Sequence, residues 1–260
     1  MNYRIRKLGH KFRQEGFGPA ISFVIRDLYF RALALTAFPF QRSVPSGGNG
    51  RDPFAEFVES MHALPAPRVL EIGSRAVSDI TVRHKFPKTA IHMGLDVHPG
   101  PNVDLVGDAH ELGALFAPEQ FDGVFSLSVF EHLLMPWVVV LEINKVLKPG
   151  GLVMVATHPT WPPHELPWDF WRFQENAFWA LFNKATGFEI ICTVTSTPAR
   201  IFPFERSSYL LGTTKTVAPM GITVLARKIG PSDPRLSWPI KAGDITATNY
   251  PTAGAKGPAC

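Results

Sequence analysis

The sequence predicts an α/β protein built on a doubly wound, mostly parallel sheet of seven strands with helices on both faces. Short apolar runs bounded by turn residues recur along the chain, and segments with helical spacing of apolar residues alternate with them. Such alternation is typical of parallel strands that are covered on both faces. The composition agrees, because 45% hydrophobic and 18% charged residues in 260 can form one sizeable core.

The elements can be placed from apolar periodicity and turn signals. The first helix of the sheet domain is expected over residues 54–63, where Asp52 and Pro53 supply a cap and a first helical position. Strands are expected at 68–74, 90–97, 103–108, 121–129, 151–157, 188–196 and 222–227. Further helices are expected at 78–86, 111–116, 137–147 and 175–185.

Composition divides the chain into three parts: a basic helical extension and linker (1–50), the sheet domain (51–229) and a loose tail (230–260) rich in Pro, Gly, Ala and Thr. Residues 1–42 hold eight Lys and Arg against two acids, whereas the remainder holds 18 bases and 20 acids. Because the sheet domain is slightly acidic, no nucleic-acid partner is expected.

The basic extension mixes cations with aromatic residues and has two interpretations. It is either a helix on an anionic membrane surface, or a helical cap over the ligand cleft or a homodimer contact. The stretch 19–40 carries Arg26, Asp27 and Arg31, so a bilayer span is not expected. No signal peptide is visible, and two cysteines form no disulfide framework. The expected location is cytoplasmic, with the inner membrane face as the place of any peripheral contact.

Polar residues stand where the first four strands end, which is where ligands bind in open α/β sheets. Gly73 allows the backbone to pass close to a ligand, Asp96 can accept from a ribose diol, and Asp108 can accept from an adenine amino group. The candidate ligand-binding residues are Glu71, Gly73, Ser74, Asp96, Val97, Asp108, Ala109 and Ser126.

These segments resemble the class I methyltransferases that depend on S-adenosylmethionine (SAM), especially a bacterial group with glycan-associated members. The resemblance covers about residues 66–228 and rests on VLEIGS (69–74), GLDV (94–97), GDAHEL (107–112), FDGVFSLSVFEHL (121–133) and EINKVLKPGGLV (142–153). It implies a Rossmann-like fold, methyltransferase activity and SAM as cofactor. It also implies that Glu71 and Gly73 border the methionine part, Asp96 holds the ribose, and Asp108 with Ala109 contacts adenine.

The loop after the first strand departs from the family pattern G-x-G-x-G. Here Gly73 is followed by Ser74, Arg75 and Ala76, so Arg75 becomes an additional candidate contact to the SAM carboxylate. Two other classes of protein stay open. A nicotinamide-dependent oxidoreductase would need a G-x-G-x-x-G fingerprint, which the sequence lacks. A binding or scaffold protein without activity would keep the same fold.

The segment 158–173 follows the fifth strand and contains three of the six tryptophans. Aromatic rings can stack on sugar faces, and charged groups can bind hydroxyls or anions, although some of the rings must serve packing. The candidate acceptor-binding residues are Trp161, Trp168, Trp171 and Arg172. The D-x-W-R-F pattern at 169–173 is similar to one in glycan-associated members, which implies O-methylation of a sugar or another small-molecule hydroxyl.

Removal of a hydroxyl proton calls for a positioned base. His164 with Asp169 as orienting partner is the first candidate, followed by His132, which could instead fix the turn after the fourth strand, and by His158. Arg172 could bind an acceptor anion or pair with Asp169 or Glu175. No His, Asp or Glu cluster has convincing ligand spacing, so no metal site is expected.

Overall fold

The computed structural model describes residues 50–76, 81–202, 216–246 and 248–251, with eight isolated positions elsewhere. The chain divides into two compact units, Met1–Pro45 and Ser46–Cys260. Six positions of the first unit between 21 and 32 are described, and all six are helical and exposed. The other expectations for the basic extension lie outside the described residues. None of the helices in the described part of the chain is long and apolar enough to cross a membrane.

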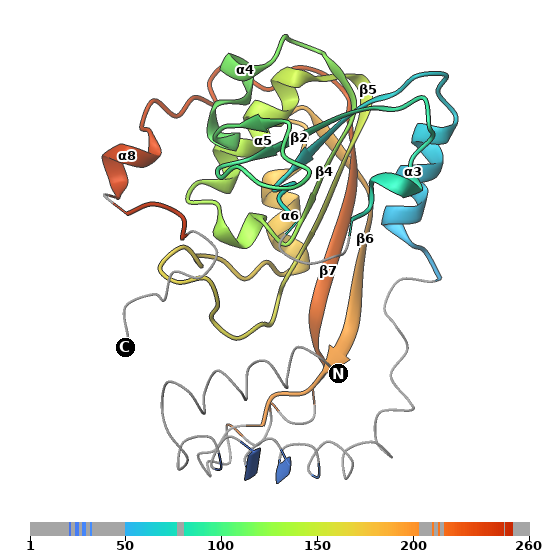
Figure 1. The fold of residues 1–260 in the computed structure, drawn as a ribbon. Helices are drawn as coiled ribbons and strands as arrows, with labels where there is room; N and C mark the ends of the chain where they lie inside the picture. Colours follow the sequence, from blue (N-terminus) through green and yellow to red (C-terminus); the bar gives the residue numbers. More distant parts are fainter. Residues whose placement is uncertain are drawn as a thin grey trace. The chain divides into compact units, whose positions relative to one another are not determined.

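The second unit is built on a seven-stranded sheet in the order β3-β2-β1-β4-β5-β7-β6 (Figure 1). Strands β3, β2, β1, β4 and β5 are parallel, and β7 runs antiparallel to both β5 and β6. The strands are β1 (Arg68–Ile72), β2 (Ile91–Asp96), β3 (Leu105–Val106), β4 (Phe121–Leu127), β5 (Leu147–Thr157), β6 (Phe188–Ala199) and β7 (Ala218–Lys228). The predicted fold class is confirmed, and the order reverses beside β1, where β2 and β4 flank it.

Helices lie on both faces of this sheet (Figure 1). The α-helices are α3 (Pro53–His62), α4 (Leu112–Leu115), α5 (Pro136–Val146), α6 (Glu175–Leu181) and α8 (Ala242–Ile245). The continuous described ranges also contain the short 3₁₀ helices η2 (Arg83–Lys85), η3 (Ala109–Glu111) and η4 (Phe130–His132). Helix α3 begins as predicted, because the Asp52 carboxylate accepts from the backbone N–H groups of Phe54 and Ala55 and Pro53 occupies the first turn.

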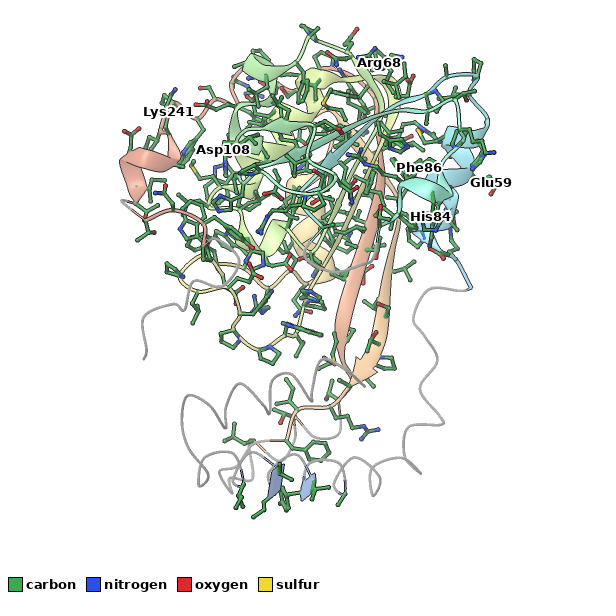
Figure 2. All side chains as sticks on the ribbon, viewed as in Figure 1. Glu59, Arg68, His84, Phe86, Asp108 and Lys241 are labelled. Atoms are coloured by element: carbon green, nitrogen blue, oxygen red, sulfur yellow. The ribbon has the colours of Figure 1, made fainter. Side chains whose placement is uncertain are left out.

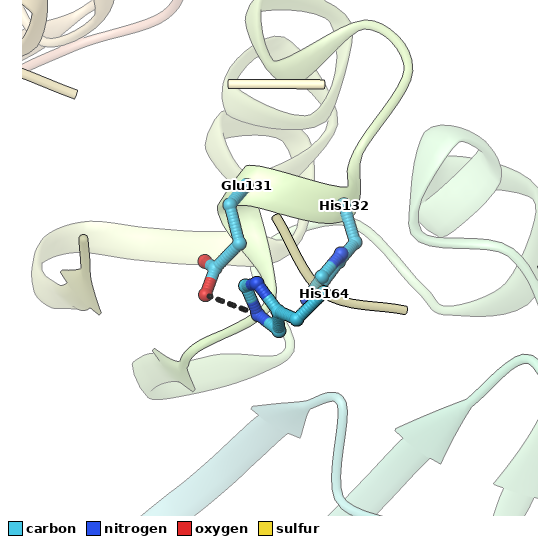
Figure 3. A group of neighbouring side chains, drawn as sticks. All are labelled: Glu131, His132 and His164. Carbon is cyan, nitrogen blue, oxygen red and sulfur yellow. Dashed lines mark ion pairs between the residues drawn. The ribbon is translucent and has the colours of Figure 1, made fainter. Parts of the chain in front are cut away.

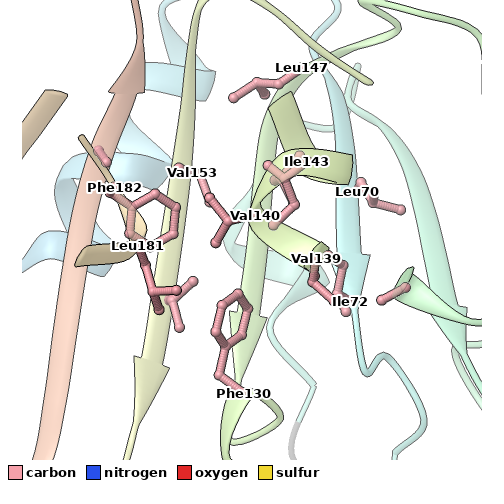
Figure 4. Packing of buried hydrophobic residues seen from close by; sticks show 14 of the residues in the cluster. Leu70, Ile72, Phe130, Val139, Val140, Ile143, Leu147, Val153, Leu181 and Phe182 are labelled. Atoms are coloured by element: carbon pink, nitrogen blue, oxygen red, sulfur yellow. The ribbon is translucent and has the colours of Figure 1, made fainter. Parts of the chain in front are cut away.

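Side chains along β1 point alternately to the two faces of the sheet, so the core forms two clusters. Leu70 and Ile72 face the side of α5, where they belong to the larger cluster with residues such as Val139 and Ile143 (Figure 4). Val69 faces the other side, where α3 packs. Gly123 in β4 permits that packing, because a Cβ there would lie 2.7 Å from the Phe57 ring.

Several predicted boundaries differ from the structure, among them those of the helix at 78–86 and of the fifth strand. Within the stretch expected to be a helix at 78–86, residues 78–80 lie outside the described residues, and the remainder forms only η2 before Pro87. Strand β5 begins at Leu147 rather than at residue 151, because Leu147 pairs with Phe121 and the ladder resumes at Leu152 after a register irregularity. The Pro-Gly-Gly turn signal therefore marks a bulge within the strand.

The tail expected to be loose packs on the sheet domain over the described residues 231–246 and 248–251. Trp238 packs edge-to-face on Trp137, with 5.5 Å between ring centroids, and Lys241 forms a 3.0 Å ion pair with Glu111. The Tyr250 carbonyl accepts a hydrogen bond from His98 Nε2 at 2.9 Å. Contacts of Trp238 and Tyr250 therefore hold this segment on the sheet domain, although its overall composition is that of a loop.

Candidate active site

A cavity of about 1130 Å³ lies at the carboxyl ends of β1, β2 and β4. The sheet ends contribute Gly73, Arg75, Asp96, Val97, Asp108 and Ala109 to its wall. The segments after β4 and β5 contribute Ser128, His132, His158, Trp161, His164, Glu165 and Trp168, and the tail contributes Ala242, Gly243, Thr246, Thr248 and Tyr250. Asp108, which follows β3, and Lys241, which belongs to the tail, lie on the side of the sheet opposite Glu59 of α3 (Figure 2).

The turn after β1 requires its glycine. Gly73 has a φ of +79°, and a Cβ on it would lie 2.1 Å from Cγ2 of Val129. Its N–H donates to the carbonyl of Leu95 at 2.8 Å, which fixes the turn against β2. The backbone therefore borders the cavity without a side chain in the way.

The end of β2 presents the Asp96 carboxylate to the cavity. Oδ1 accepts from the N–H of His98 at 2.9 Å, and Oδ2 accepts from the N–H of Arg75 at 3.2 Å. The Nε atom of Arg75 lies 3.5 Å from Oδ1. A carboxylate has about four lone-pair sites, so Asp96 can still accept from two hydroxyl groups.

The end of β3 leads into the Asp108 carboxylate, which caps η3. Its Oδ1 accepts from the backbone N–H of His110 at 2.9 Å and from His110 Nδ1 at 2.6 Å. The N–H of Met135 donates to His110 Nε2, so the proton of this ring is on Nδ1. Burial opposes ionisation, but the bonds from His110 hold the pKa of Asp108 below its ordinary value. Oδ2 is left to accept from a ligand.

Three predicted ligand-binding residues do not line the cavity. Glu71 lies on the α3 face of β1, where its carboxylate is 3.7 Å from Arg83 Nε, and burial raises its pKa to about 7. Ser74 and Ser126 are 3% and 1% exposed, and neither hydroxyl has a hydrogen-bond partner among the described residues. Strand alternation turns Glu71 and Ser126 away from the crevice between the strand ends, whereas Ser74 is buried in the loop after β1.

The predicted acceptor segment divides in the same way. Trp161 and Trp168 line the cavity, whereas Trp171 donates from Nε1 to the carbonyl of Leu133 at 2.8 Å and does not. Arg172 is bound to both carboxylate oxygens of Asp169, at 2.6 and 2.7 Å. Trp171 and Arg172 therefore support the acceptor segment and are not part of the cavity wall.

The Asp169–Arg172 pair also positions His164. Oδ2 of Asp169 accepts from the His164 backbone N–H at 2.8 Å and lies 3.4 Å from Nδ1 of the same residue. Burial opposes the charged form of Asp169, but the hydrogen bonds from Arg172 lower its pKa to about 2. The predicted orientation of His164 by Asp169 is thus present in the geometry.

His164 lies beside a carboxylate that the sequence did not single out as functional. Glu131, in η4, is 0% exposed, and its Oε2 accepts from the Thr157 hydroxyl at 2.6 Å. Its Oε1 lies 4.0 Å from His164 Nε2 (Figure 3). The same oxygen lies 3.4 Å from His158 Nε2. The pattern Glu-His after β4 was visible, but no spacing rule links residue 131 to residue 164.

Other cavity residues were not expected either. Tyr250 is bound through its hydroxyl to Glu165, and Thr248 accepts from Trp168 Nε1 at 3.1 Å. Both come from the tail, far along the chain from the strands whose ends they cover. Their only signal in the sequence was an aromatic residue in an otherwise loop-like stretch.

Comparisons with known proteins agree with this geometry. Residues 80–155 match the family described as methyltransferase domain. The fold is similar to that of a candidate methyltransferase from Bacillus halodurans C-125, with a TM-score of 0.51, 14% identity, and coverage of 68% of this chain and 98% of that chain. No curated protein matches the chain.

A further solved structure resembles the chain less closely. It is the 1,6-didemethyltoxoflavin-N1-methyltransferase of Burkholderia thailandensis with bound S-adenosylhomocysteine. Its TM-score is 0.46 at 15% identity, and the match covers 79% of this chain and 89% of that chain.

The matched domain defines the activity that this sheet carries, which is methyl transfer. The match selects a methyltransferase over a nicotinamide-dependent oxidoreductase, and SAM is the cofactor that the sequence resemblance implies. The residues present fit that cofactor, because two carboxylates at neighbouring strand ends and the glycine turn border one cavity. Asp96 would hold the ribose hydroxyls and Asp108 the adenine amino group.

Proposed function

We propose that the protein transfers the methyl group of SAM to a hydroxyl of a sugar or of another small molecule. The observation that carries the proposal is the continuity of one cavity from Asp96 and Asp108 to a wall of Trp161, His164 and Trp168. Indole rings suit the apolar face of a sugar, and imidazoles suit its hydroxyls. This combination at the far end of the cofactor cavity favours a polar organic acceptor.

The enzyme has two tasks once donor and acceptor are bound. SAM supplies an electrophilic methyl group, and the protein must hold the acceptor oxygen in line with it and keep water out. Tyr250 and Thr248 of the tail also line the cavity, and the hydrogen bond from Trp168 to Thr248 joins the tail to the acceptor wall. The cavity is therefore bounded by the sheet, the acceptor segment and the tail.

The acceptor hydroxyl must also lose its proton, and His164 is the base that the geometry favours. Its Nδ1 is next to the Asp169 carboxylate, so its Nε2 can accept the proton while Asp169 stabilises the resulting cation. Asp169 is ionised at neutral pH, since its pKa is about 2. His132 suits this role less well, because its Nδ1 partner is the neutral carbonyl of Trp168 at 2.5 Å, which stabilises a cationic ring less than a carboxylate does.

Two experiments test the proposal. Calorimetry with SAM, S-adenosylhomocysteine and NADH should give binding of the two sulfur ligands only. Labelled SAM should then transfer its methyl group to members of a panel of hydroxyl acceptors, and mass spectrometry of the product should locate it on oxygen. Transfer only to amines or carbon acids in a matched panel would refute O-methylation.

A pair of variants tests the base. His164→Gln should lower kcat by about 100-fold with unchanged SAM affinity, since general base catalysis contributes roughly that factor. His84→Gln is the matched control, because His84 is exposed on η2 outside the cavity wall. Equal rates for wild type and His164→Gln on an accepted hydroxyl would remove His164 from the mechanism.

A further inference from the structure

The side chains of Glu131, His132 and His164 converge, although the sequence predicted no metal site (Figure 3). One ligand atom from each of the three lies within 4.8 Å of the other two. We infer that this group binds a divalent transition-metal ion, with these three residues as the protein ligands. The binding inference stands on the ligand geometry, and the use of the ion in methyl transfer rests on the proposed function.

The first argument is that only one of the two carboxylate oxygens of Glu131 has a hydrogen-bond partner. The side chain is fully buried, and its Oε1 has no hydrogen-bond partner among the described residues, whereas Oε2 is satisfied by Thr157. A buried carboxylate oxygen without a partner is unfavourable by several kcal/mol in order of magnitude. A cation next to Oε1 would remove that penalty.

The second argument is the tautomer of the histidines. Nδ1 of His132 contacts the carbonyl of Trp168 at 2.5 Å. Nδ1 of His164 contacts the carbonyl of Pro162 at 3.3 Å and Asp169 Oδ2 at 3.4 Å. All of these oxygens can only accept, so each Nδ1 must carry a proton and each neutral ring keeps a lone pair on Nε2. Metal-binding histidines are held in this way, by a carbonyl or carboxylate on the other ring nitrogen.

His158 strengthens the case from the other side of the carboxylate. Its Nδ1 contacts the carbonyl of Met220 at 3.0 Å, so the same reasoning leaves a lone pair on its Nε2. That atom lies 3.4 Å from Oε1 of Glu131, which also has only lone pairs. When His158 and His164 are neutral, the lone pairs on both Nε2 atoms face the lone pairs of Glu131 Oε1, which is repulsive. A cation between these atoms would attract all three.

The ligand types select the class of ion. Two imidazoles and one carboxylate suit Zn²⁺ and other first-row divalent ions, whereas Mg²⁺ and Ca²⁺ prefer oxygen ligands only. Tetrahedral bonds of about 2.1 Å need ligand atoms roughly 3.4 Å apart, so the group must contract slightly when it binds the ion. Three protein ligands leave one position for a water or acceptor oxygen, as in catalytic zinc sites.

His132 and His164 both line the cavity, so this open position can face the acceptor. An ion there would lower the pKa of a bound acceptor hydroxyl, so that its proton could pass to solvent water without His164, whose Nε2 would be a ligand. A metal ion and a proton therefore compete for the lone pair on His164 Nε2. Activity measured with and without the ion then separates the form in which His164 is a metal ligand from the form in which it is the base.

The test uses the untagged full-length chain, freed of metal by a chelator and titrated with ZnCl₂ by calorimetry in the absence of SAM. We expect one Zn²⁺ per chain. Glu131→Gln and His164→Gln should each weaken binding by more than about 100-fold, because even residues that only support metal ligands change affinity 10- to 100-fold. His84→Gln, the exposed control, should bind as wild type does.

Cobalt(II) gives an independent signal, because its visible d–d bands appear on binding to such a site and should be lost in both ligand variants. If Glu131→Gln does not fold, His164→Gln decides, since its side chain is 29% exposed. A folded wild-type chain without stoichiometric Zn²⁺ binding, or variants that bind as wild type does, would overturn the inference. Zn²⁺ binding without methyl transfer would overturn only the proposed function, and His164-dependent transfer without Zn²⁺ binding would overturn only the metal site.

Discussion

Arg75 contacts the Asp96 carboxylate with both its backbone and its side chain. The backbone N–H donates to Oδ2 at 3.2 Å, and Nε of the guanidinium lies 3.5 Å from Oδ1. In the sequence Arg75 stood where the family pattern has glycine, and its expected role was a contact to the SAM carboxylate. The structure places its charge beside the residue that would hold the ribose, so it positions that carboxylate at the edge of the cavity.

Replacement of Asp96 tests the cofactor site most directly. Asp96→Asn keeps the shape of the side chain but removes its charge and one accepting oxygen. We expect SAM affinity to fall by about 10- to 100-fold, since a hydrogen bond to a charged group is worth roughly 1.5–3 kcal/mol. Calorimetry measures the change, and Glu189→Gln on β6, with a half-exposed side chain that pairs with Arg227, is the control. Unchanged affinity would exclude the ribose assignment.

Replacement of Gly73 tests the turn at the end of β1. Gly73→Ala combines a positive φ with a Cβ that would meet Val129 at 2.1 Å. The free energy of unfolding should fall by about 2 kcal/mol or more, and SAM binding should weaken in the fraction that still folds. Gly243→Ala on α8 is the matched control, because a Cβ there meets nothing within 4 Å. Equal denaturation midpoints for the two variants would contradict the strained turn.

The buried carboxyl of Glu71 predicts a pH dependence of stability. Its pKa in the folded protein is about 7, against 4.5 as the ordinary value, so the folded state binds more protons between these pH values. Stability from this group is present below pH 4.5 and is lost as the pH rises through 7, by about 3 kcal/mol at most.

Glu71→Gln removes this titration. The variant should therefore gain melting temperature relative to wild type as the pH rises from 5 to 8, while Arg83 keeps its 2.7 Å bond to Asp104. Thermal unfolding across this range measures the difference between the two proteins. A difference that stays constant with pH would show that Glu71 is ionised throughout.

The support of the acceptor segment can be separated from cofactor binding through Arg172. Besides Asp169, its guanidinium contacts the carbonyls of Trp161 and Pro162 at 2.9 and 3.1 Å. Arg172→Lys cannot form this forked set of bonds, so stability should fall by about 1–2 kcal/mol and KM for the acceptor should rise. The Kd for SAM should stay within twofold of wild type. A large loss of SAM affinity would mean that Arg172 acts on the cofactor side.

The sequence predicted the parts of the structure that depend on local pattern. Apolar runs and turn signals placed all seven strands, and strand ends marked Asp96 and Asp108, because parallel strands bring their carboxyl ends to one edge. The direction of individual side chains was harder to predict. Glu71 precedes Gly73 by two residues, yet it lies on the α3 face and pairs with Arg83.

Contacts between distant segments had no local signal at all. Glu131 and His164 come from η4 and from a segment without regular structure, and only the packed fold brings them together. The same holds for Tyr250, whose ring lies 5.5 Å from that of His132. In the tail, two aromatic side chains outweigh a composition that otherwise predicts a mobile coil.

The acceptor wall and the tail contribute to the cavity without belonging to the hydrogen-bonded sheet. Residues 158–174 and 229–251 lie outside every strand, whereas Asp96 and the Gly73 turn are joined directly to β2 and β1. Substitutions in those two segments can therefore alter which molecule is accepted while the nucleoside end keeps its shape. A directed-evolution library confined to them, with Asp169, Arg172 and the buried Phe173 kept, would change substrate preference with little penalty in folding yield.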